Sequence, residues 1–221
     1  MYFRIRLGKS GRAAVAGSIL TLLAGGPAHA GPEEDFASGM ISYRRADFAT
    51  AIPTLRKAAD AGHAQAQALL ASILDAADQD EEAVAYYRKS AASGNLDGIF
   101  GLGTMLAAGE GVAKDVKEAR KLYTRAAEGG HKLAIAAMAE AYIRGELSIS
   151  EGERKGADAL KWISLAADDN VVAALEEMEK AYRTGDYGLA MDSVKADQIK
   201  QKLVAAKGLK ERKGRRRGDK Q

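Results

Sequence analysis

Residue types that could carry out catalysis or bind a metal are few and far apart in this sequence. The chain has no cysteine, which excludes a thiol nucleophile, a disulfide framework and a lipid-modified cysteine anchor. After residue 30 there are two histidines, His63 and His131, and each follows a glycine that closes a repeated segment. Asn95 occupies the equivalent place between them, so the two imidazoles lie two segments apart and cannot share a metal ion. We interpret both histidines as polar residues at helix starts, and we expect no metal and no cofactor.

Carboxylates are abundant, but they form no catalytic pattern. Acidic runs such as residues 78–82 and 176–179 are typical of solvated helix faces and turns. Gly109-Glu110-Gly111 has only a superficial likeness to a phosphate-binding loop, because it lacks the Lys-Ser/Thr pair and follows no strand. The Ser-x-x-Lys pattern of enzymes that react with β-lactams is also missing. The sequence therefore predicts a protein that is not an enzyme.

Small residues recur at two series of equivalent positions along the chain, which we call columns. The columns indicate the repeated structural elements that must position any site. The first column is Ala51, Ala83, Ala119, Ala159 and Ala196, and the second, fifteen residues after each of the first four, is Ala66, Gly98, Ala134 and Ala174. A turn recurs as well, at Gly62, Gly94, Gly130 and Asn170, with spacings of 32, 36 and 40 residues. Self-similarity at this period is typical of a solenoid, in which each unit buries its apolar face against its neighbours.

Residues 98–130 show most clearly what one unit contains. Apolar and small residues from Gly98 to Ala107 have helical spacing, and Gly109 and Gly111 mark a break where the chain reverses. Asp115 suits the start of a second helix, with Glu118 three residues later as in a capping box. Each unit is thus a helical hairpin, and Gly145 and Gly185 mark the same break in later units. We predict an all-α fold, a right-handed α/α superhelical solenoid of about five helical hairpins.

The same residues resemble the Sel-one-like repeat, a relative of the tetratricopeptide repeat. Residues 98–130 match the family pattern almost throughout, with Leu106 and Leu122 in place of its Tyr and Trp. Residues 134–170 match with a longer loop at Glu146–Gly156, and residues 174–206 match in part. The resemblance implies a scaffold that binds another protein or peptide in a concave groove lined by the first helix of each hairpin. We expect the repeated aromatic residues Tyr43, Tyr142, Tyr182 and Trp162 to belong to the core between helices.

The first thirty residues predict a signal peptide. Four basic residues precede an apolar run at 13–24, and Ala28 and Ala30 form a small-x-small cleavage site before Gly31. The apolar run has twelve residues, whereas a membrane-spanning helix needs about 20. We expect an exported protein, periplasmic or secreted, with no transmembrane helix in the mature chain. Anchoring by an uncleaved signal segment and a mitochondrial transit peptide are the alternatives.

The formal net charge of +3 combines segments of opposite sign. Residues 31–206, the predicted solenoid, hold 21 basic and 28 acidic residues, a net charge of −7. Residues 207–221 hold eight Lys or Arg against two acidic residues, and we expect this basic tail to be disordered. The tail could contact an anionic polymer or lipid, or serve only to increase solubility; nucleic acid is the least expected partner of an exported chain. The alternative function is a cell-wall or polysaccharide-binding or hydrolysing envelope protein.

Overall fold

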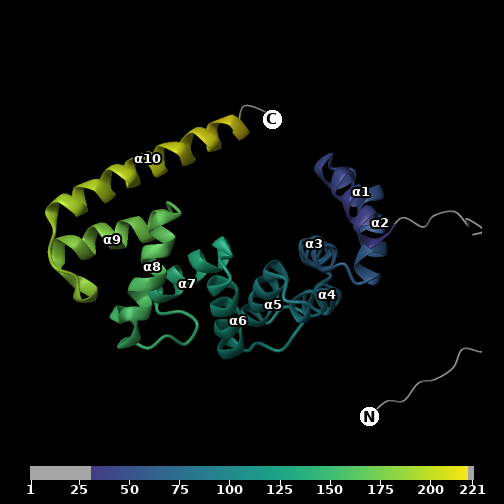
Figure 1. Ribbon diagram of the computed structural model, residues 1–221, viewed down its shortest axis with the longest axis horizontal. Helices are drawn as coiled ribbons and strands as arrows, with labels where there is room; N and C mark the ends of the chain where they lie inside the picture. Colours follow the sequence, from purple (N-terminus) through teal and green to yellow (C-terminus); the bar gives the residue numbers. More distant parts are fainter. Residues whose placement is uncertain (1–30, 219–221) are drawn as a thin grey trace, which may run out of the picture.

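The structure, a computed structural model, describes residues 31–218, with side chains to residue 208, and every regular element in that range is helical (Figure 1). The α-helices are α1 (Pro32–Arg44), α2 (Phe48–Asp60), α3 (Ala64–Asp75), α4 (Asp80–Ala92), α5 (Leu96–Ala108), α6 (Val116–Glu128), α7 (Lys132–Arg144), α8 (Ala157–Asp168), α9 (Val172–Thr184) and α10 (Ser193–Gly218). Two short 3-10 helices, η1 (Glu153–Lys155) and η2 (Asp186–Gly188), lie in the last two hairpin loops. The prediction of an all-α solenoid is confirmed.

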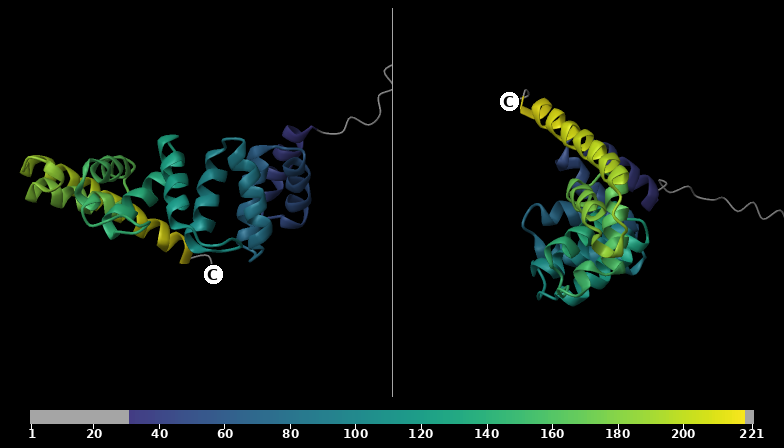
Figure 2. Two further views of the ribbon diagram at one scale, coloured as in Figure 1. Left: turned by 90° about the horizontal axis from the view of Figure 1, so that it is seen from below. Right: turned by 90° about the vertical axis from the view of Figure 1, so that its left-hand side faces the viewer.

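The helices form five successive hairpins, from α1–α2 to α9–α10, which stack along the long axis of the molecule (Figure 2). From α3 onward, each first helix contacts the second helix of the preceding hairpin as well as its own partner. Gly31 is the N-cap of α1 and Pro32 begins that helix, where proline loses no hydrogen bond. The expected signal peptide, with Ala28 and Ala30 at its cleavage site, lies outside the described residues.

The two columns of small residues lie where neighbouring helices meet. All eight alanines of the columns are 0 % exposed, and Gly98 is buried as well. A Cβ atom on Gly98 would lie 2.3 Å from Ser90 Oγ and 2.9 Å from the backbone nitrogen of Ala91. Since real Cβ atoms do not approach so closely, α4 and α5 are packed at a distance that only glycine allows at this position.

Glycines on first helices also receive aromatic rings from second helices. A Cβ atom on Gly101 would lie 2.1 Å from Cε1 of Tyr87, and one on Gly103 would lie 2.8 Å from Cδ1 of Tyr123. Both tyrosine rings are buried. The glycines of α5 therefore bring α4 and α6 close on both sides, and the rings fill the space beside the helix crossings. Tyr142 and Trp162 are buried as expected, whereas Tyr43 and Tyr182 are half-buried.

The turn glycines have backbone conformations that other residues rarely adopt. The angle φ is positive at Gly62, Gly94, Gly109, Gly111, Gly130, Gly145 and Gly185. Gly111 has a second reason to be glycine, since a Cβ atom there would lie 2.4 Å from the carbonyl oxygen of Asp80 at the start of α4. Gly109-Glu110-Gly111 is thus the turn inside the third hairpin, packed against the preceding one. Asn170, in place of the closing glycine, has φ +61°, which asparagine tolerates better than most residues.

The predicted capping box at α6 forms only in part. Asp115 is the N-cap, and its Oδ1 accepts a hydrogen bond from the Glu118 backbone nitrogen at 3.0 Å. The Glu118 carboxylate is 2.8 Å from Lys121 Nζ, and the Asp115 N–H donates to the carbonyl of Leu106. In a full capping box the Glu118 carboxylate would also accept a hydrogen bond from the Asp115 N–H. That bond is not among the contacts of the described residues, because the Asp115 N–H already donates to Leu106 in the hairpin turn.

The two ends of the stack differ in polarity. Glu34 occupies on α1 the position that Ala66 and Gly98 occupy in later hairpins, and it is exposed. A charged residue at this position is typical of a terminal repeat whose outer face meets solvent. At the other end, Val204 of α10 takes the place of Ala167 and is 65 % exposed, since no further hairpin follows among the described residues.

The boundary predicted at residue 206 does not end the helical structure. Helix α10 continues to Gly218, so residues 207–218 of the tail expected to be disordered are helical. Among the residues of α10 with described side chains, which end at residue 208, Ala206 is the last buried one. Lysine and arginine are good helix formers and this stretch has no proline, which agrees with a helix that continues past residue 206.

Replacing Gly98 by alanine tests the close packing of α4 and α5. We expect Gly98→Ala to lower the free energy of unfolding by about 1–3 kcal/mol, because the added methyl group meets backbone as well as Ser90. Gly152→Ala is the matched control, since nothing lies within 4 Å of a Cβ atom there. Chemical denaturation followed by circular dichroism measures both. Equal stability of the two variants would contradict the packing described above.

Candidate binding groove

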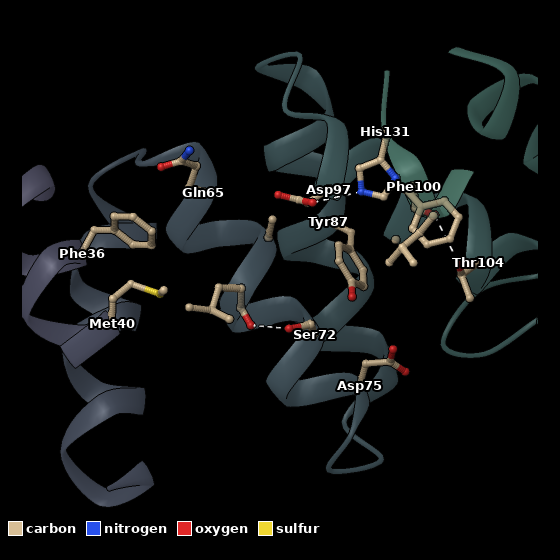
Figure 3. Close-up of a pocket in the computed structure, with 14 residues that line it drawn as sticks. Phe36, Met40, Gln65, Ser72, Asp75, Tyr87, Asp97, Phe100, Thr104 and His131 are labelled. Carbon is tan, nitrogen blue, oxygen red and sulfur yellow. Dashed lines mark hydrogen bonds and ion pairs between the residues drawn. The ribbon is translucent and has the colours of Figure 1, made fainter. Parts of the chain in front are cut away.

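A groove of about 700 Å³ lies between first helices of successive hairpins (Figure 3). Its walls come from α1, α3, α5 and α7, and Tyr87 reaches it from α4. The lining residues are Phe36, Met40, Gln65, Ala68, Leu69, Ser72, Asp75, Tyr87, Asp97, Phe100, Gly101, Thr104, His131 and Leu133. Most of these residues belong to first helices of their hairpins.

The groove exists because one repeat position alternates between large and small residues. Phe36 on α1 and Phe100 on α5 occupy equivalent positions, 64 residues apart, and Ala68 of α3 occupies that position between them. Two aromatic side chains therefore stand on either side of a small one, as Figure 3 shows for the two phenylalanines. The hollow over Ala68 has the apolar walls that an inserted side chain would contact.

Acidic groups lie at both ends of this apolar floor. Asp97 is in the first turn of α5, and Asp75 is the last residue of α3, so their carboxylates lie at opposite ends of the groove (Figure 3). Burial raises the pKa of Asp75, and the nearby charges of Asp80 and Asp78 raise it further. Within residues 31–208, no lysine or arginine lines the groove or forms an ion pair with Asp75.

Tyr87 forms part of the floor without contributing a reactive group. Its side chain is 6 % exposed, and the ring fits against Gly101. Burial raises the pKa of Tyr87 to about 12, and the charges of Asp75 and Asp97 act in the same direction. The phenol therefore stays neutral at ordinary pH and can only donate or accept a hydrogen bond.

His131 lies at the rim of the groove, and both of its ring nitrogens form hydrogen bonds with protein groups. Its Nδ1 accepts a hydrogen bond from the Ala134 backbone nitrogen at 3.1 Å, which caps α7. Because Nδ1 accepts, the proton is on Nε2, which donates to Asp97 Oδ1 at 3.0 Å. The ring centroid lies 4.9 Å from that of Phe100. His131 thereby fixes the positions of both Asp97 and Phe100.

His63 makes the same set of contacts two hairpins earlier. Its Nδ1 caps α3 through the Ala66 nitrogen, and its Nε2 is 2.9 Å from Glu33 Oε2. The ring stacks on Phe36 with centroids 4.3 Å apart. A helix-capping histidine therefore supports each aromatic wall of the groove. This agrees with the interpretation of both histidines as residues at helix starts.

Comparison with known families and structures identifies the repeats. The model of the Sel1 repeat family matches residues 64–95, 96–131 and 132–171, which correspond to the hairpins α3–α4, α5–α6 and α7–α8. Residues 64–171 are Sel1 repeats. Sel1 repeats generally mediate protein–protein interactions and are typically non-catalytic. No curated protein matches the sequence.

Solved structures show the same fold. One is a protective antigen present in uropathogenic Escherichia coli strains that displays an SLR fold, with a TM-score of 0.69 and 24 % identity over 80 % of this chain. A Sel1 repeat protein from Oxalobacter formigenes has the same TM-score, identity and coverage of this chain. The chain spans 38 % and 52 % of the lengths of these two proteins. The likeness therefore concerns the architecture of the Sel1 solenoid.

A second hollow, of about 560 Å³, lies over α6 and has the opposite charge. Lys117, Lys121 and Arg125 follow one another at i, i+4 and i+8, and Arg120 completes the basic set. The sequence analysis above does not predict this surface. The spacing of four residues between basic side chains would have indicated one basic helix face. The other wall of the hollow, Leu147 and Ser148, comes from the long loop after α7 and could not be assigned from spacing.

The long loop after α7 is held by specific contacts. Arg154 donates from Nε to the carbonyl of Tyr142 at 3.3 Å and from Nη2 to that of Ile143, which satisfies the end of α7. Glu153 accepts hydrogen bonds from Ser150 and Arg120, and these lower its pKa to about 2, with the Ser150 hydroxyl as the largest cause. The inserted residues of the third Sel1 repeat thus fold back on the solenoid.

The described chain was also compared with the requirements of a metal site and of a membrane-spanning helix. Within residues 31–218, no group of three His, Cys, Asp or Glu residues could hold a metal ion. None of the helices in that range is both long and apolar enough to span a membrane.

Substitution of His131 tests its role at the groove rim. We expect His131→Ala to lower the free energy of unfolding by about 1 kcal/mol, because α7 loses its cap. His131→Asn should retain most of this stability, since Asn95 caps α5 through the Gly98 nitrogen at the equivalent position. Thermal unfolding of the three proteins measures the difference. An asparagine variant as unstable as the alanine variant would show that the cap is not what His131 contributes.

Proposed function

We propose that this protein is an exported Sel1 scaffold that holds a segment of another protein in its concave groove and acts as an adaptor or regulator. The observation that carries the proposal is the hollow over Ala68, bounded by Phe36 and Phe100 and rimmed by carboxylates. An apolar side chain of Leu or Met size would contact both rings there. Full burial of such a side chain contributes about 1.5–3 kcal/mol, enough to act as the anchor of a peptide.

The exposed part of the groove also favours recognition over reaction. Leu133 of α7 lines it and is 64 % exposed, so the groove presents a large apolar side chain that a bound partner would cover. The residues around it supply hydrogen-bonding and charged groups at the rim, and no nucleophile next to a base. This arrangement suits binding of a peptide or a partner domain.

Export, which the first thirty residues predict, is part of the proposal. If residues 1–30 form a signal peptide, the protein isolated from a cell envelope or medium begins at Gly31. N-terminal sequencing after fractionation measures this. Recovery of the chain from the cytoplasm with Met1 retained would contradict export, and recovery from membranes with Met1 retained would indicate an uncleaved anchor.

Groove-dependent capture tests the binding function. We expect the full chain, immobilised, to retain a partner from envelope extract, and Leu133→Lys to lose at least tenfold of it, because a charge then occupies the apolar rim. Leu165→Lys is the matched control: Leu165 is 41 % exposed on α8 and does not line the groove. Quantitative mass spectrometry compares the three baits. A partner lost equally from both lysine variants, or from neither, would contradict binding in the groove.

A further inference from the structure

The second hollow carries a row of cations that the chain neutralises only in part. Lys117, Lys121 and Arg125 are exposed on one face of α6, and successive members of the row are about 6 Å apart along the helix axis. Lys121 is paired with Glu118 at 2.8 Å. Among the residues whose side chains the structure describes, Lys117 and Arg125 form no ion pair. The row can therefore accept further carboxylates.

The wall opposite this row is held in place by the core. Leu147 packs against the hydrophobic core, and Ile149 in the same loop is buried. Arg154 fastens the loop to the end of α7 through the carbonyl oxygens of Tyr142 and Ile143. A ligand that enters the hollow therefore meets a preformed surface, and binding requires little ordering of the loop.

The dimensions of the hollow suit an extended peptide. Lys117 and Arg125 are eight residues apart, which is about 12 Å along α6. Alternate side chains of an extended chain lie on one side, about 6.6 Å apart, so three of them span about 13 Å. Such a peptide would turn its first, third and fifth side chains toward the cations. Its second and fourth side chains would face the other wall, Leu147 and Ser148.

The surrounding charges favour a short acidic segment over a long anionic polymer or a lipid surface. Glu128, at the end of α6, lines the hollow, and Glu153 lies 2.8 Å from Arg120. Residues 31–206 as a whole have a net charge of −7. A ligand whose negative charge extends beyond the hollow would meet these carboxylates, whereas a segment of about five residues can stay on the cationic row.

We propose that the hollow over α6 binds an acidic segment of a partner protein in extended conformation, with alternate Asp or Glu side chains on Lys117, Lys121 and Arg125. This site goes beyond the proposed function, which concerns the groove alone. The described residues that line the hollow are all different from those that line the groove, so the two sites can be filled independently. With both filled, the solenoid joins two partner segments of opposite charge.

A labelled peptide with the central sequence Glu-Leu-Glu-Ser-Glu serves as the probe. We expect the full chain to bind it at least tenfold more tightly than Gln-Leu-Gln-Ser-Gln in fluorescence anisotropy, with binding weakened by added salt. The order Glu-Glu-Glu-Leu-Ser should bind severalfold more weakly than the probe, because its three carboxylates cannot all face the row. Equal affinity for the three peptides, or no binding of the probe, would overturn the proposal.

Charge-matched variants locate the contact. One protein has glutamine in place of each cation of the row: Lys117→Gln, Lys121→Gln and Arg125→Gln. The control loses three exposed cations outside the hollow: Arg44→Gln, Arg88→Gln and Lys200→Gln. The first protein should bind the probe at least tenfold more weakly than the wild-type chain, and the control should stay within threefold. Equal losses would mean that only net charge matters, contrary to the proposal.

Replacing Leu147 by glycine tests the other wall. Leu147 has φ +51°, a conformation that glycine adopts without strain, and circular dichroism checks that the variant keeps its fold. The wild-type chain should prefer Glu-Leu-Glu-Ser-Glu over Glu-Gly-Glu-Ser-Glu severalfold. Leu147→Gly should bind the two peptides equally, because the apolar contact is gone. A preference that persists in Leu147→Gly would contradict the placement of the peptide between the two walls.

Further outcomes separate this site from the groove and from other ligands. Leu133→Lys should bind the probe within twofold of the wild-type chain, and a loss as large as that of the row variant would place the peptide in the groove. Row-dependent binding to phosphatidylglycerol vesicles without binding of the probe would assign a lipid surface instead. Self-association in sedimentation that is lost in the row variant would assign a second copy of the chain. Each of these three results overturns the inference.

The two proposals can fail separately. If the probe does not bind while the wild-type chain still captures a partner that Leu133→Lys loses, the site over α6 is wrong and the groove function stands. If the probe binds as expected and no partner depends on Leu133, the groove function is wrong and the site over α6 stands.

Discussion

Close contact between the backbones of neighbouring helices is the constraint on which this solenoid depends. Where Gly98 faces α4, the nearest atoms of Ser90 and Ala91 leave no space for a methyl group. The alanine columns provide almost the same approach at the other crossings, and their members are fully buried. Because each hairpin meets the next in this way, all first helices lie on the same side, and that side becomes the concave surface.

The groove is a local departure from this regularity. The stacking would be similar with any apolar residue at positions 36, 68 and 100, but the actual order, Phe-Ala-Phe, leaves a hollow between two rings. The histidines at the helix starts keep the two rings in place through stacking and helix capping. Function in a repeat protein of this kind comes from variation at one position on a constant framework.

Charge distinguishes the surfaces of the molecule. The concave groove carries carboxylates at both ends, whereas α6 presents a basic face over the second hollow. The segment after residue 206 is basic although the body before it is acidic. If the proposed function holds, a partner with acidic and basic regions would contact this protein in a defined orientation, with its cationic part at the groove.

The repeat period, the buried columns and the turn glycines could all be recognised from the sequence, because helix spacing and backbone conformation are properties of neighbouring residues. The histidines could be assigned to helix starts for the same reason. Two features could not be recognised in this way: the contact of the Glu118 carboxylate with Lys121 in place of the reciprocal bond of the capping box, and the continuation of α10 beyond residue 206. Both depend on which of several available hydrogen bonds or extensions forms. The groove was decided by tertiary structure alone: Phe36 and Phe100 are 64 residues apart, and only the stacking of three hairpins makes them walls of one site.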